Sequence, residues 1–179
     1  LATECPIEKI MSNQIGWNFN NTYLKLPSQM LSKVKPTPVK DPETIIFNHD
    51  LSKEIGLDFS KINEHEIALI FSGNKLPNGS ETISQAYAGH QFGHFTILGD
   101  GRAHIVGEHV TRQKKRFDIQ FKGSGQTPYS RNADGRAALG PMLREYLISE
   151  AMFNLGVRTT RSLAVVKTGE NVVRETNLQ

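Results

Sequence analysis

The chain has 179 residues, 37% of them hydrophobic and 22% charged, which is enough for one well-buried domain with or without an irregular arm. The net charge is +3, and acidic residues are interspersed among the basic ones along the sequence. The sequence therefore has no continuous basic stripe of the kind that binds nucleic acid. The single cysteine, Cys5, excludes an internal disulfide and a multi-cysteine zinc site, and no apolar run approaches the roughly 18 residues of a membrane span. We therefore expect a soluble protein of the reducing cytoplasm.

The N-terminal segment is expected to frame the domain rather than to carry its chemistry. Residues 1–10 precede Met11, after which aromatic and apolar content rises, so they are interpreted as a remnant of expression or upstream sequence; the alternative is a processed native N-terminus. Residues 11–42 hold closely spaced prolines and show no sustained hydrophobic period. They predict an extended arm that lies on the domain surface.

Several short elements are expected between the arm and the middle of the chain. The apolar run at 44–47 predicts a strand, and Asp50 is a candidate N-cap for a helix that continues to Leu57. Residues 63–73 and 82–89 predict two more short helices, separated by a turn. These elements are expected to pack against the domain and frame it.

A β-hairpin is expected next, with strands at 104–110 and 116–122. The basic run RQKKR at 112–116 lies between them and is interpreted as a solvated hairpin tip rather than a nucleic-acid patch. Alternate positions of the second strand are apolar, namely Phe117, Ile119 and Phe121. Lys122 therefore belongs to the opposite, polar face, where a ligand could reach it.

A helix is predicted over 141–155, because proline suits the first helical turn and glycine the position just past the end. Pro141 and Gly156 occupy those two positions. Apolar residues recur at intervals of four and predict the core-facing stripe, namely Leu143, Leu147, Ala151 and Leu155. Glu145 lies at the margin of this stripe, within reach of a lysine on the sheet.

A second strand pair is expected near the C-terminal end, between 162–167 and 171–175 across a glycine-containing turn. The two hairpins, the helix between them and the short helices predict an α+β fold built on antiparallel strands. The sequence contains no internal repeat and no low-complexity tract.

Glycine-rich turns beside cationic side chains are the main chemical signal. GDGR at 99–102 and GSG at 123–125 match neither the P-loop nor the full dinucleotide fingerprint, so each alone reads as a tight turn. The charged residues near them are Arg102, Lys122, Arg131, Asp134 and Arg136. So many cations beside glycine turns suit a polyphosphate. In addition, Lys122 on a strand and Glu145 on the next helix could form the ion pair that positions phosphates in kinase-like lobes, although Glu145 could equally belong to an ordinary structural salt bridge.

Two other groups of polar residues are weaker candidates. His90 and His94 have the spacing of metal ligands on one helical face, but glycines interrupt the helix and no third ligand is apparent, so structural hydrogen bonding is favoured. A group of hydroxyl residues could supply a nucleophile, but none has a histidine at a motif spacing. They are interpreted as hydrogen-bonding loop residues or as sites of self-modification, and they are Ser124, Thr127, Tyr129 and Ser130.

Taken in order, the peptides of the second half closely resemble the selenoprotein O family. The matching peptides are AYAGHQFGHF at 86–95, LGDGRA at 98–103, DIQFKGSGQTPYSR at 118–131, DGRAALGPMLREYLISEAM at 134–152 and LGVRTTRSLAVVKTGE at 155–170. The resemblance runs from about Ile15 to the end of the chain. It implies a protein-kinase-like N-lobe that binds ATP in an inverted orientation, so that AMP is transferred to serine, threonine or tyrosine hydroxyls of proteins and pyrophosphate is released.

The resemblance also implies roles for individual residues. Those carried over as nucleotide contacts are Gly99, Gly101, Arg102, Lys122, Asp134 and Gly135. Within this set Lys122 would contact the phosphates, and Glu145 would pair with Lys122 in a supporting ion pair. Ala133 departs from the family pattern, because glycine is expected there more often.

On this resemblance, residues 43–179 are a nucleotide-binding N-lobe, and the catalytic lobe would follow Gln179. The family's catalytic aspartate, its metal-binding asparagine and aspartate, its C-terminal redox residue and two further phosphate-binding arginines are all expected past that residue. No catalytic residue and no metal ligand are therefore expected within the chain, which alone should be inactive. ATP with Mg²⁺ or Mn²⁺ would serve the complete protein.

Other functions stay open on the sequence alone. The complete protein could transfer the γ-phosphoryl group as an ordinary protein kinase, or it could use UTP in place of ATP. An alternative of another class is a non-catalytic module that senses nucleotide or binds protein. The expected partners are a nucleotide and proteins with target hydroxyl groups; neither nucleic acid nor a membrane is expected.

Overall fold

The computed structural model of the chain describes residues 15–91 and 93–172. Its larger sheet is antiparallel and has five strands in the order β1–β3–β5–β6, with β4 paired to β3. These strands are β1 (Leu31–Lys33), β3 (Ile83–Gln91), β4 (His94–Gly99), β5 (Ala103–Val110) and β6 (Arg116–Lys122). A smaller antiparallel sheet pairs β2 (Glu43–Phe47) with β7 (Ala164–Lys167).

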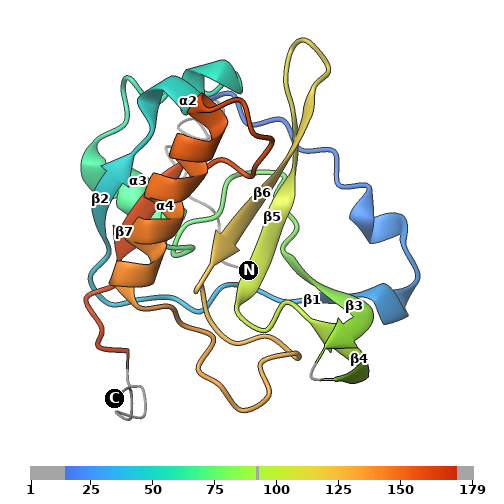
Figure 1. Ribbon diagram of the computed structural model, residues 1–179. Coiled ribbons are helices and arrows are strands. Elements are labelled where there is room, and N and C mark those ends of the chain that lie inside the picture. Colours follow the sequence, from blue (N-terminus) through green and yellow to red (C-terminus); the bar gives the residue numbers. More distant parts are fainter. Residues whose placement is uncertain (1–14, 92, 173–179) are drawn as a thin grey trace, which may run out of the picture.

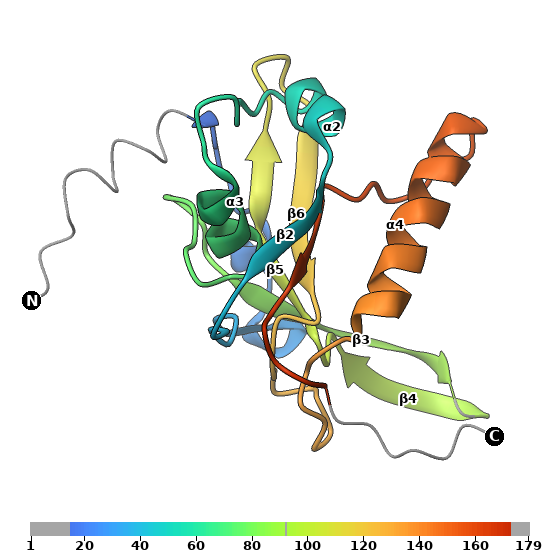
Figure 2. The same cartoon turned by 90° about the vertical axis from the view of Figure 1, so that its left-hand side faces the viewer.

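The helices of the described residues are α2 (His49–Glu54), α3 (Glu64–Phe71) and α4 (Leu139–Asn154), with two short 3-10 turns, η1 (Tyr23–Lys25) and η2 (Ser28–Met30). None of these described helices has the length and apolar character needed to cross a membrane. Figure 1 places α2, α3 and the β2–β7 pair on one side of β5 and β6, and Figure 2 shows α4 standing apart from the strands. The fold is therefore mixed α and β with antiparallel sheets, as expected.

The hydrophobic core lies between the β5–β6 hairpin and helices α2 and α3. β5 is buried at nearly every position, whereas β6 alternates, so that Ile119 and Phe121 are buried and Lys122 is exposed. Phe71 of α3 packs on Phe121 with 6.2 Å between ring centroids. The predicted hairpin is confirmed, and its basic tip at 112–116 is exposed.

Asparagine caps begin both short helices. The side chain of Asn48 accepts a hydrogen bond from the Leu51 N–H at 2.9 Å at the start of α2. The expectation that Asp50 is the cap is wrong, because Asp50 lies inside the first turn of that helix. Its negative charge interacts favourably there with the helix dipole. Asn63 caps α3 in the same way as Asn48 and confirms the helix that was expected there.

The N-terminal segment is not confined to the surface, because its first described residues join the core. Ile15 is buried, and Trp17 stacks on Phe19 with 5.4 Å between ring centroids. Phe19 lies over Gly107 of β5, where a Cβ atom would be 2.5 Å from the phenyl ring. Glycine at this position is therefore what lets the aromatic side chain pack directly on the strand.

A buried glutamate fastens the same segment to β5. The carboxylate of Glu108 accepts hydrogen bonds from Thr22 Oγ1 at 2.7 Å and from the Tyr23 N–H at 3.0 Å, and Arg116 donates to it at 3.1 Å. Burial alone would raise the pKa of Glu108, but the bonds from Thr22 and Tyr23 and the charge of Arg116 outweigh it, so the pKa lies below its ordinary value. The charged form is thus satisfied although it is buried.

Residues 82–89 were expected to form a helix, but 83–89 belong to strand β3 and Thr82 directly precedes it. Their alanine and glutamine favour helix locally, but β3 pairs with β1, β4 and β5, and these sheet hydrogen bonds outweigh the local preference. Gly93, with φ of +81°, lies in the turn that leads into β4. The helix prediction is wrong here because it took no account of strands elsewhere in the chain.

Strand β7 pairs with β2 rather than with the segment that follows it. The register joins Glu43 to Lys167 and Phe47 to Ala164. Of the expected partner segment, 171–172 is not in a strand and 173–175 lies outside the described residues. The strand at 44–47 is confirmed, and it pairs with the strand ending at 167, a partner that lies far away in the sequence where only a neighbouring partner was expected.

Helix α4 confirms the predicted helix but not its predicted core stripe. Leu147 and Leu155 are 63% and 77% exposed. The contacts that hold α4 are polar: Glu150 accepts hydrogen bonds from Arg161 at 2.6 and 2.8 Å and from Asn48 at 3.0 Å. The core-stripe prediction is therefore wrong, since the leucine spacing marks an exposed face of the helix.

Candidate functional site

The two glycine-rich turns of the sequence lie against each other. The turn at 99–102 joins β4 to β5, and the turn at 123–125 follows β6. The Gly123 N–H donates to the Arg102 carbonyl at 2.7 Å, and Lys122 is paired in the β5–β6 ladder with the residue that follows Arg102. The main chains of Arg102 and Lys122 thus lie close together at the same end of the hairpin.

Hydroxyl side chains hold the first turn to the loop after β6. Thr127 Oγ1 donates to the Asp100 carbonyl at 2.7 Å, and Ser130 Oγ donates to the Gly101 carbonyl at 2.6 Å. Both acceptors are backbone groups that a tight turn would otherwise leave to water. This is the loop hydrogen bonding that was expected of the hydroxyl residues.

Three of the candidate glycines are required by the close packing of the loops. A Cβ atom at Gly99 would lie 2.2 Å from the ring of Tyr129, and one at Gly101 would lie 2.8 Å from the carbonyl oxygen of Tyr129. At Gly135, with φ of +68°, a Cβ atom would lie 2.0 Å from the carbonyl oxygen of Gly125. A larger residue would force neighbouring backbone to move, so these glycines are what brings the loops together.

The second DGR sequence closes the loop that follows β6. The Gly125 N–H donates to the Gly135 carbonyl at 3.1 Å, and Asp134 Oδ1 accepts from the Arg136 N–H at 2.8 Å. The guanidinium of Arg136 reaches the N-terminal segment, where it donates to the Thr37 carbonyl at 3.2 Å. Of these two candidate residues, Asp134 is exposed and Gly135 is buried.

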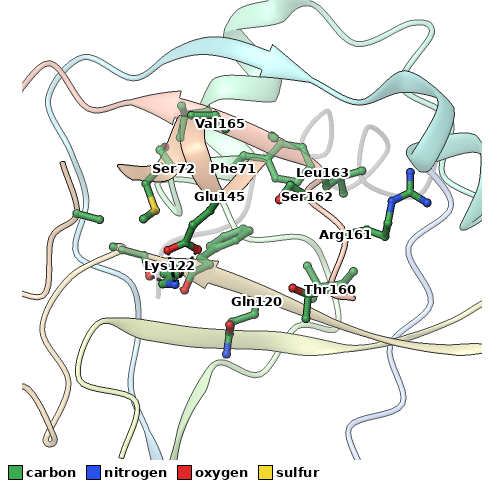
Figure 3. Close-up of a pocket in the computed structure, with 18 of the residues that line it drawn as sticks. Phe71, Ser72, Gln120, Lys122, Glu145, Thr160, Arg161, Ser162, Leu163 and Val165 are labelled. Atoms are coloured by element: carbon green, nitrogen blue, oxygen red, sulfur yellow. Dashed lines mark hydrogen bonds and ion pairs between the residues drawn. The ribbon is translucent and has the colours of Figure 1, made fainter. Parts of the chain in front are cut away.

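Lys122 and Glu145 form the ion pair suggested by their positions. Nζ of Lys122 lies 2.7 Å from both carboxylate oxygens of Glu145, and the two side chains are 40% and 49% exposed. Figure 3 shows Glu145 pointing toward Lys122 at the end of β6. A pair this exposed contributes only about 0–1 kcal/mol to stability, so it matters for where it holds the ammonium group.

A cavity of about 1270 Å³ opens between β6, α4 and β7, and the ion pair lines part of it. Its apolar wall includes Phe71, Phe121 and Val165. In the close-up, Lys122 and Glu145 face each other on one side of this space and Arg161 lies well away from them (Figure 3). The site thus combines a fixed cation with an apolar wall, which is the usual make-up of a small-molecule site.

Burial changes the pKa values of two groups beside the turns. Burial raises the pKa of Asp100, which lies between the two glycines of the first turn. Burial lowers the pKa of His104 to about 4, and the positive charge of Arg136 acts in the same direction. His104 is therefore neutral at physiological pH, and the positive charge that acts on it comes from Arg136.

The two histidines with helical spacing do not form a metal pair. His90 is paired with Phe95 and His94 with Gln91 in adjacent rows of the β3–β4 ladder, so the two histidine side chains belong to opposite faces. In the part of the chain that the structure describes, no three His, Cys, Asp or Glu residues gather as a metal site would need. The helical spacing loses its meaning because the segment is a strand.

Sequence reasoning missed the residues that hold the second turn in place. The Thr37 N–H donates to the Ser124 carbonyl at 2.8 Å, and His104 Nδ1 lies 2.7 Å from Ser124 Oγ. A histidine on an apolar strand directly after GDGR was an available signal for His104. Nothing in the sequence pointed to Thr37, because it reaches the turn from the distant N-terminal segment.

Comparison with known proteins places this geometry in context. A family model described as protein adenylyltransferase SelO matches residues 13–178. The chain is 62% identical over 175 residues to the protein nucleotidyltransferase YdiU of Nitrosococcus oceani, an alignment that covers 97% of the chain and 36% of that protein. It is 63% identical over 161 residues to the protein nucleotidyltransferase YdiU of Pelagibacter ubique, covering 90% and 33% respectively. The chain thus spans about a third of the length of these curated relatives.

Proposed function

Because the chain belongs to the SelO protein adenylyltransferase family, we propose that it is the nucleotide-binding part of a protein nucleotidyltransferase. The complete enzyme would transfer AMP from ATP to serine, threonine or tyrosine hydroxyls of target proteins. Residues 43–179 would form a protein-kinase-like N-lobe, and a catalytic lobe would come from the part of the relatives' length that this chain does not span. The proposed location is the reducing cytoplasm, since Cys5 is the one cysteine of the chain.

The observation that carries this proposal is the Lys122–Glu145 ion pair beside two interlocked glycine turns. The pair joins a strand to the following helix, and its 2.7 Å contacts hold the ammonium group at the end of β6. Arg102 adds a second cation at the same end of the hairpin. A strand lysine fixed by a helix glutamate is the arrangement that positions nucleotide phosphates in kinase-like lobes.

Each candidate residue then has a role in holding the nucleotide. Arg102 and Lys122 would contact the phosphates, because guanidinium and ammonium groups neutralise polyphosphate charge. Gly99 and Gly101 would form the turn against which the nucleotide lies. Asp134 and Gly135 would form the rest of that wall of the nucleotide site. Glu145 would not touch the nucleotide; it would keep Lys122 in place.

The proposed reaction follows from the orientation of the triphosphate. With ATP inverted relative to ordinary kinases, the α-phosphorus faces the acceptor hydroxyl. The hydroxyl gives up its proton to a base of the catalytic lobe, and its oxygen forms the new P–O bond. The bond between the α-phosphorus and the bridging oxygen breaks, and pyrophosphate leaves with that oxygen. Fixed cations such as Lys122 would stabilise the charge that develops on the phosphates.

A divalent cation, Mg²⁺ or Mn²⁺, would accompany ATP in the complete enzyme and neutralise part of the triphosphate charge. The residues described here do not fit such a metal, because no group of three His, Cys, Asp or Glu side chains comes together among them. We therefore assign no metal ligand to this part of the chain. On the same reasoning, we expect the chain alone to bind nucleotide without transferring it.

Lys122→Ala in the full-length protein tests the phosphate site. Isothermal calorimetry should show ATP binding weakened about tenfold or more, because a charge-assisted contact contributes roughly 1.5–3 kcal/mol. Lys33→Ala is the matched control: Lys33 also forms an exposed ion pair, with Glu81 at 3.3 Å, but on β1. Unchanged affinity in the Lys122 variant, or equal loss in both variants, would remove Lys122 from the phosphate site.

Labelled nucleotides test the transfer itself. With ATP labelled at the α-phosphate, the full-length protein should incorporate label into protein, whereas ATP labelled at the γ-phosphate should leave none. Retention of the γ label alone would mean ordinary phosphoryl transfer, and preference for UTP would change the nucleotide but not the chemistry. If neither label is incorporated although ATP binds, a non-catalytic nucleotide-sensing module is the better description.

A further inference from the structure

His104 is a buried polar residue that the proposed chemistry does not use. It lies on β5 two residues after Arg102 and is 0% exposed. Its Nδ1 is 2.7 Å from Ser124 Oγ, and the Ser124 hydroxyl donates to the Phe121 carbonyl at 3.3 Å. Which of the two side chains donates in the 2.7 Å contact depends on which ring nitrogen of His104 carries the hydrogen.

Ser124 is the point at which several parts of the site meet. Its carbonyl accepts the Thr37 N–H at 2.8 Å, and it forms an isolated antiparallel bridge with Arg136. Its neighbour Gly123 donates to the Arg102 carbonyl at 2.7 Å. A change in the position of Ser124 would therefore displace hydrogen-bonded groups in both glycine turns and in the N-terminal segment.

The second ring nitrogen of His104 makes histidine an unfavourable residue for merely filling space in the core. Nε2 is buried and has no hydrogen-bond partner among the described residues. Burial lowers the pKa of His104 to about 4, the charge of Arg136 acts in the same direction, and the backbone of Lys35 acts in the opposite one. An apolar residue would fill the same space without an unpartnered nitrogen, so what distinguishes histidine here is its bond to Ser124.

We propose that His104 is a positioning residue of the nucleotide site: its bond to Ser124 fixes the turn at 123–125 and so holds Lys122 in register with Asp134 and Gly135. His104 acts through Ser124 and does not itself contact the nucleotide. The expected effect on nucleotide affinity rests on the proposed function. The structural half of the inference, the fixing of the turn, stands on the hydrogen bonds alone.

The variants for the test are His104→Leu, His104→Asn and Ser124→Ala, each in the full-length protein. Leucine fills the space without a hydrogen-bonding group, asparagine places an amide group near the position of Nδ1, and alanine removes only the serine oxygen. His109→Leu is the matched control, because His109 is 1% exposed on the same strand. Its Nε2 lies 2.9 Å from the Ile55 carbonyl, on the core side and away from both turns.

We expect His104→Leu and Ser124→Ala each to weaken ATP binding about tenfold by calorimetry, in proportion to the loss of one buried hydrogen bond. The double variant should be no weaker than Ser124→Ala alone, because both substitutions remove the His104–Ser124 bond and only Ser124→Ala also removes the bond to the Phe121 carbonyl. His104→Asn should recover most of the affinity, and His109→Leu should lower the melting temperature without changing affinity. Wild-type affinity in a folded His104→Leu or Ser124→Ala protein would overturn the proposal, as would an equal loss in His109→Leu.

Hydrogen exchange without nucleotide separates this inference from the proposed function. Amides of residues 123–136 should exchange faster in His104→Leu and Ser124→Ala than in the wild type, and at the wild-type rate in His109→Leu. If ATP fails to bind the wild-type protein, the proposed function fails. Faster exchange in the variants would still show that the His104–Ser124 bond fixes the turn at 123–125. Unchanged exchange in both turn variants overturns the inference whatever ATP does, and Ser124→Ala supplies the answer if the histidine variant does not fold.

Discussion

At the scale of single residues, the structure requires glycine at the candidate site for a different reason from the one that the sequence suggests. Glycine turns beside cations suggest backbone that opens toward a phosphate. In the structure, the space of a side chain at Gly99, Gly101 and Gly135 is already taken by neighbouring loop atoms. The glycines let the loops pack on each other, and the cations Arg102 and Lys122 are positioned as a result.

Gly135→Ala should therefore unfold or loosen the site loops. Gly135 has φ of +68°, and an added Cβ would lie 2.0 Å from the Gly125 carbonyl oxygen, so we expect a loss of about 2 kcal/mol or more in unfolding free energy. Gly140→Ala is the control, because Gly140 lies in α4 with no atom within 4 Å of an added Cβ. It should gain up to about 1 kcal/mol. Urea denaturation measures both, and a neutral Gly135→Ala would contradict the packing role.

The buried histidines should make stability depend on pH between 7 and 5. The pKa of His104 is lowered to about 4 in the folded state from an ordinary 6.5, and burial also lowers the pKa of His109. The unfolded chain therefore binds more protons in this range, so stability is full above about pH 6.5 and falls as the pH decreases toward 4. His104 alone should cost about 2 kcal/mol between pH 7 and pH 5.

Denaturation at a series of pH values checks this dependence. His104→Asn should flatten the decrease because it removes the titrating group while keeping a side chain that can hydrogen-bond to Ser124. A wild-type unfolding free energy that is constant from pH 7 to pH 5 would mean that His104 is not held neutral by the fold.

At the scale of elements, the sequence predicted those whose signals are local. Alternating apolar residues gave the β5–β6 hairpin, and Pro141 and Gly156 framed α4 to within a few residues. Residues 82–89 were mistaken for a helix, because strand β3 depends on pairing with three other strands. The partner of β7 is β2, far away in sequence, and no local pattern encodes such a pairing.

The same limit applies to the candidate site. Lys122 and Glu145 could be paired from alternation and helix spacing, because one strand and the next helix are involved. Ser124, Thr127 and Ser130 could be placed in a loop, but not assigned to particular acceptors. The core stripe of α4 failed because spacing identifies one face of a helix without saying what, if anything, covers that face.

Substitutions in α4 should distinguish the exposed stripe from the true core. Leu147 is 63% exposed, so Leu147→Ala should change the unfolding free energy of the chain by less than about 0.5 kcal/mol. Ile67 of α3 is 3% exposed in the core, and Ile67→Ala should cost about 2–5 kcal/mol. Chemical denaturation of residues 1–179 measures both variants. A cost for Leu147→Ala that approaches that of Ile67→Ala would restore the stripe to the core.

At the scale of the whole molecule, the N-terminal segment connects the core to the site. Its first described residues pack with Trp17 and Phe19 against β5. Further along, Thr37 donates to the Ser124 carbonyl at 2.8 Å and accepts from Arg136 at 3.2 Å. One stretch of chain therefore stabilises the sheet at one end and the candidate nucleotide loops at the other.

Phe19→Ala should destabilise the whole chain through this segment. Phe19 stacks on Trp17 at 5.4 Å and covers Gly107, so we expect a loss of about 2 kcal/mol or more in unfolding free energy. Leu26→Ala in the same segment is the control, because Leu26 is 40% exposed and should cost less than about 0.5 kcal/mol. Equal, small effects in urea denaturation would mean that the segment is only a surface arm.

The pairing of β2 with β7 sets a constraint on how the chain can fold as it is synthesised. Glu43 is made early, but its ladder partner Lys167 leaves the ribosome only after almost the whole stretch described here has been translated. Contacts this distant close slowly, since a long loop must be ordered before its pairing contributes any stability. Until then Phe47 has no strand to pair with, so the nascent chain exposes an apolar edge while the intervening residues 48–163 are made, which is when aggregation competes with folding.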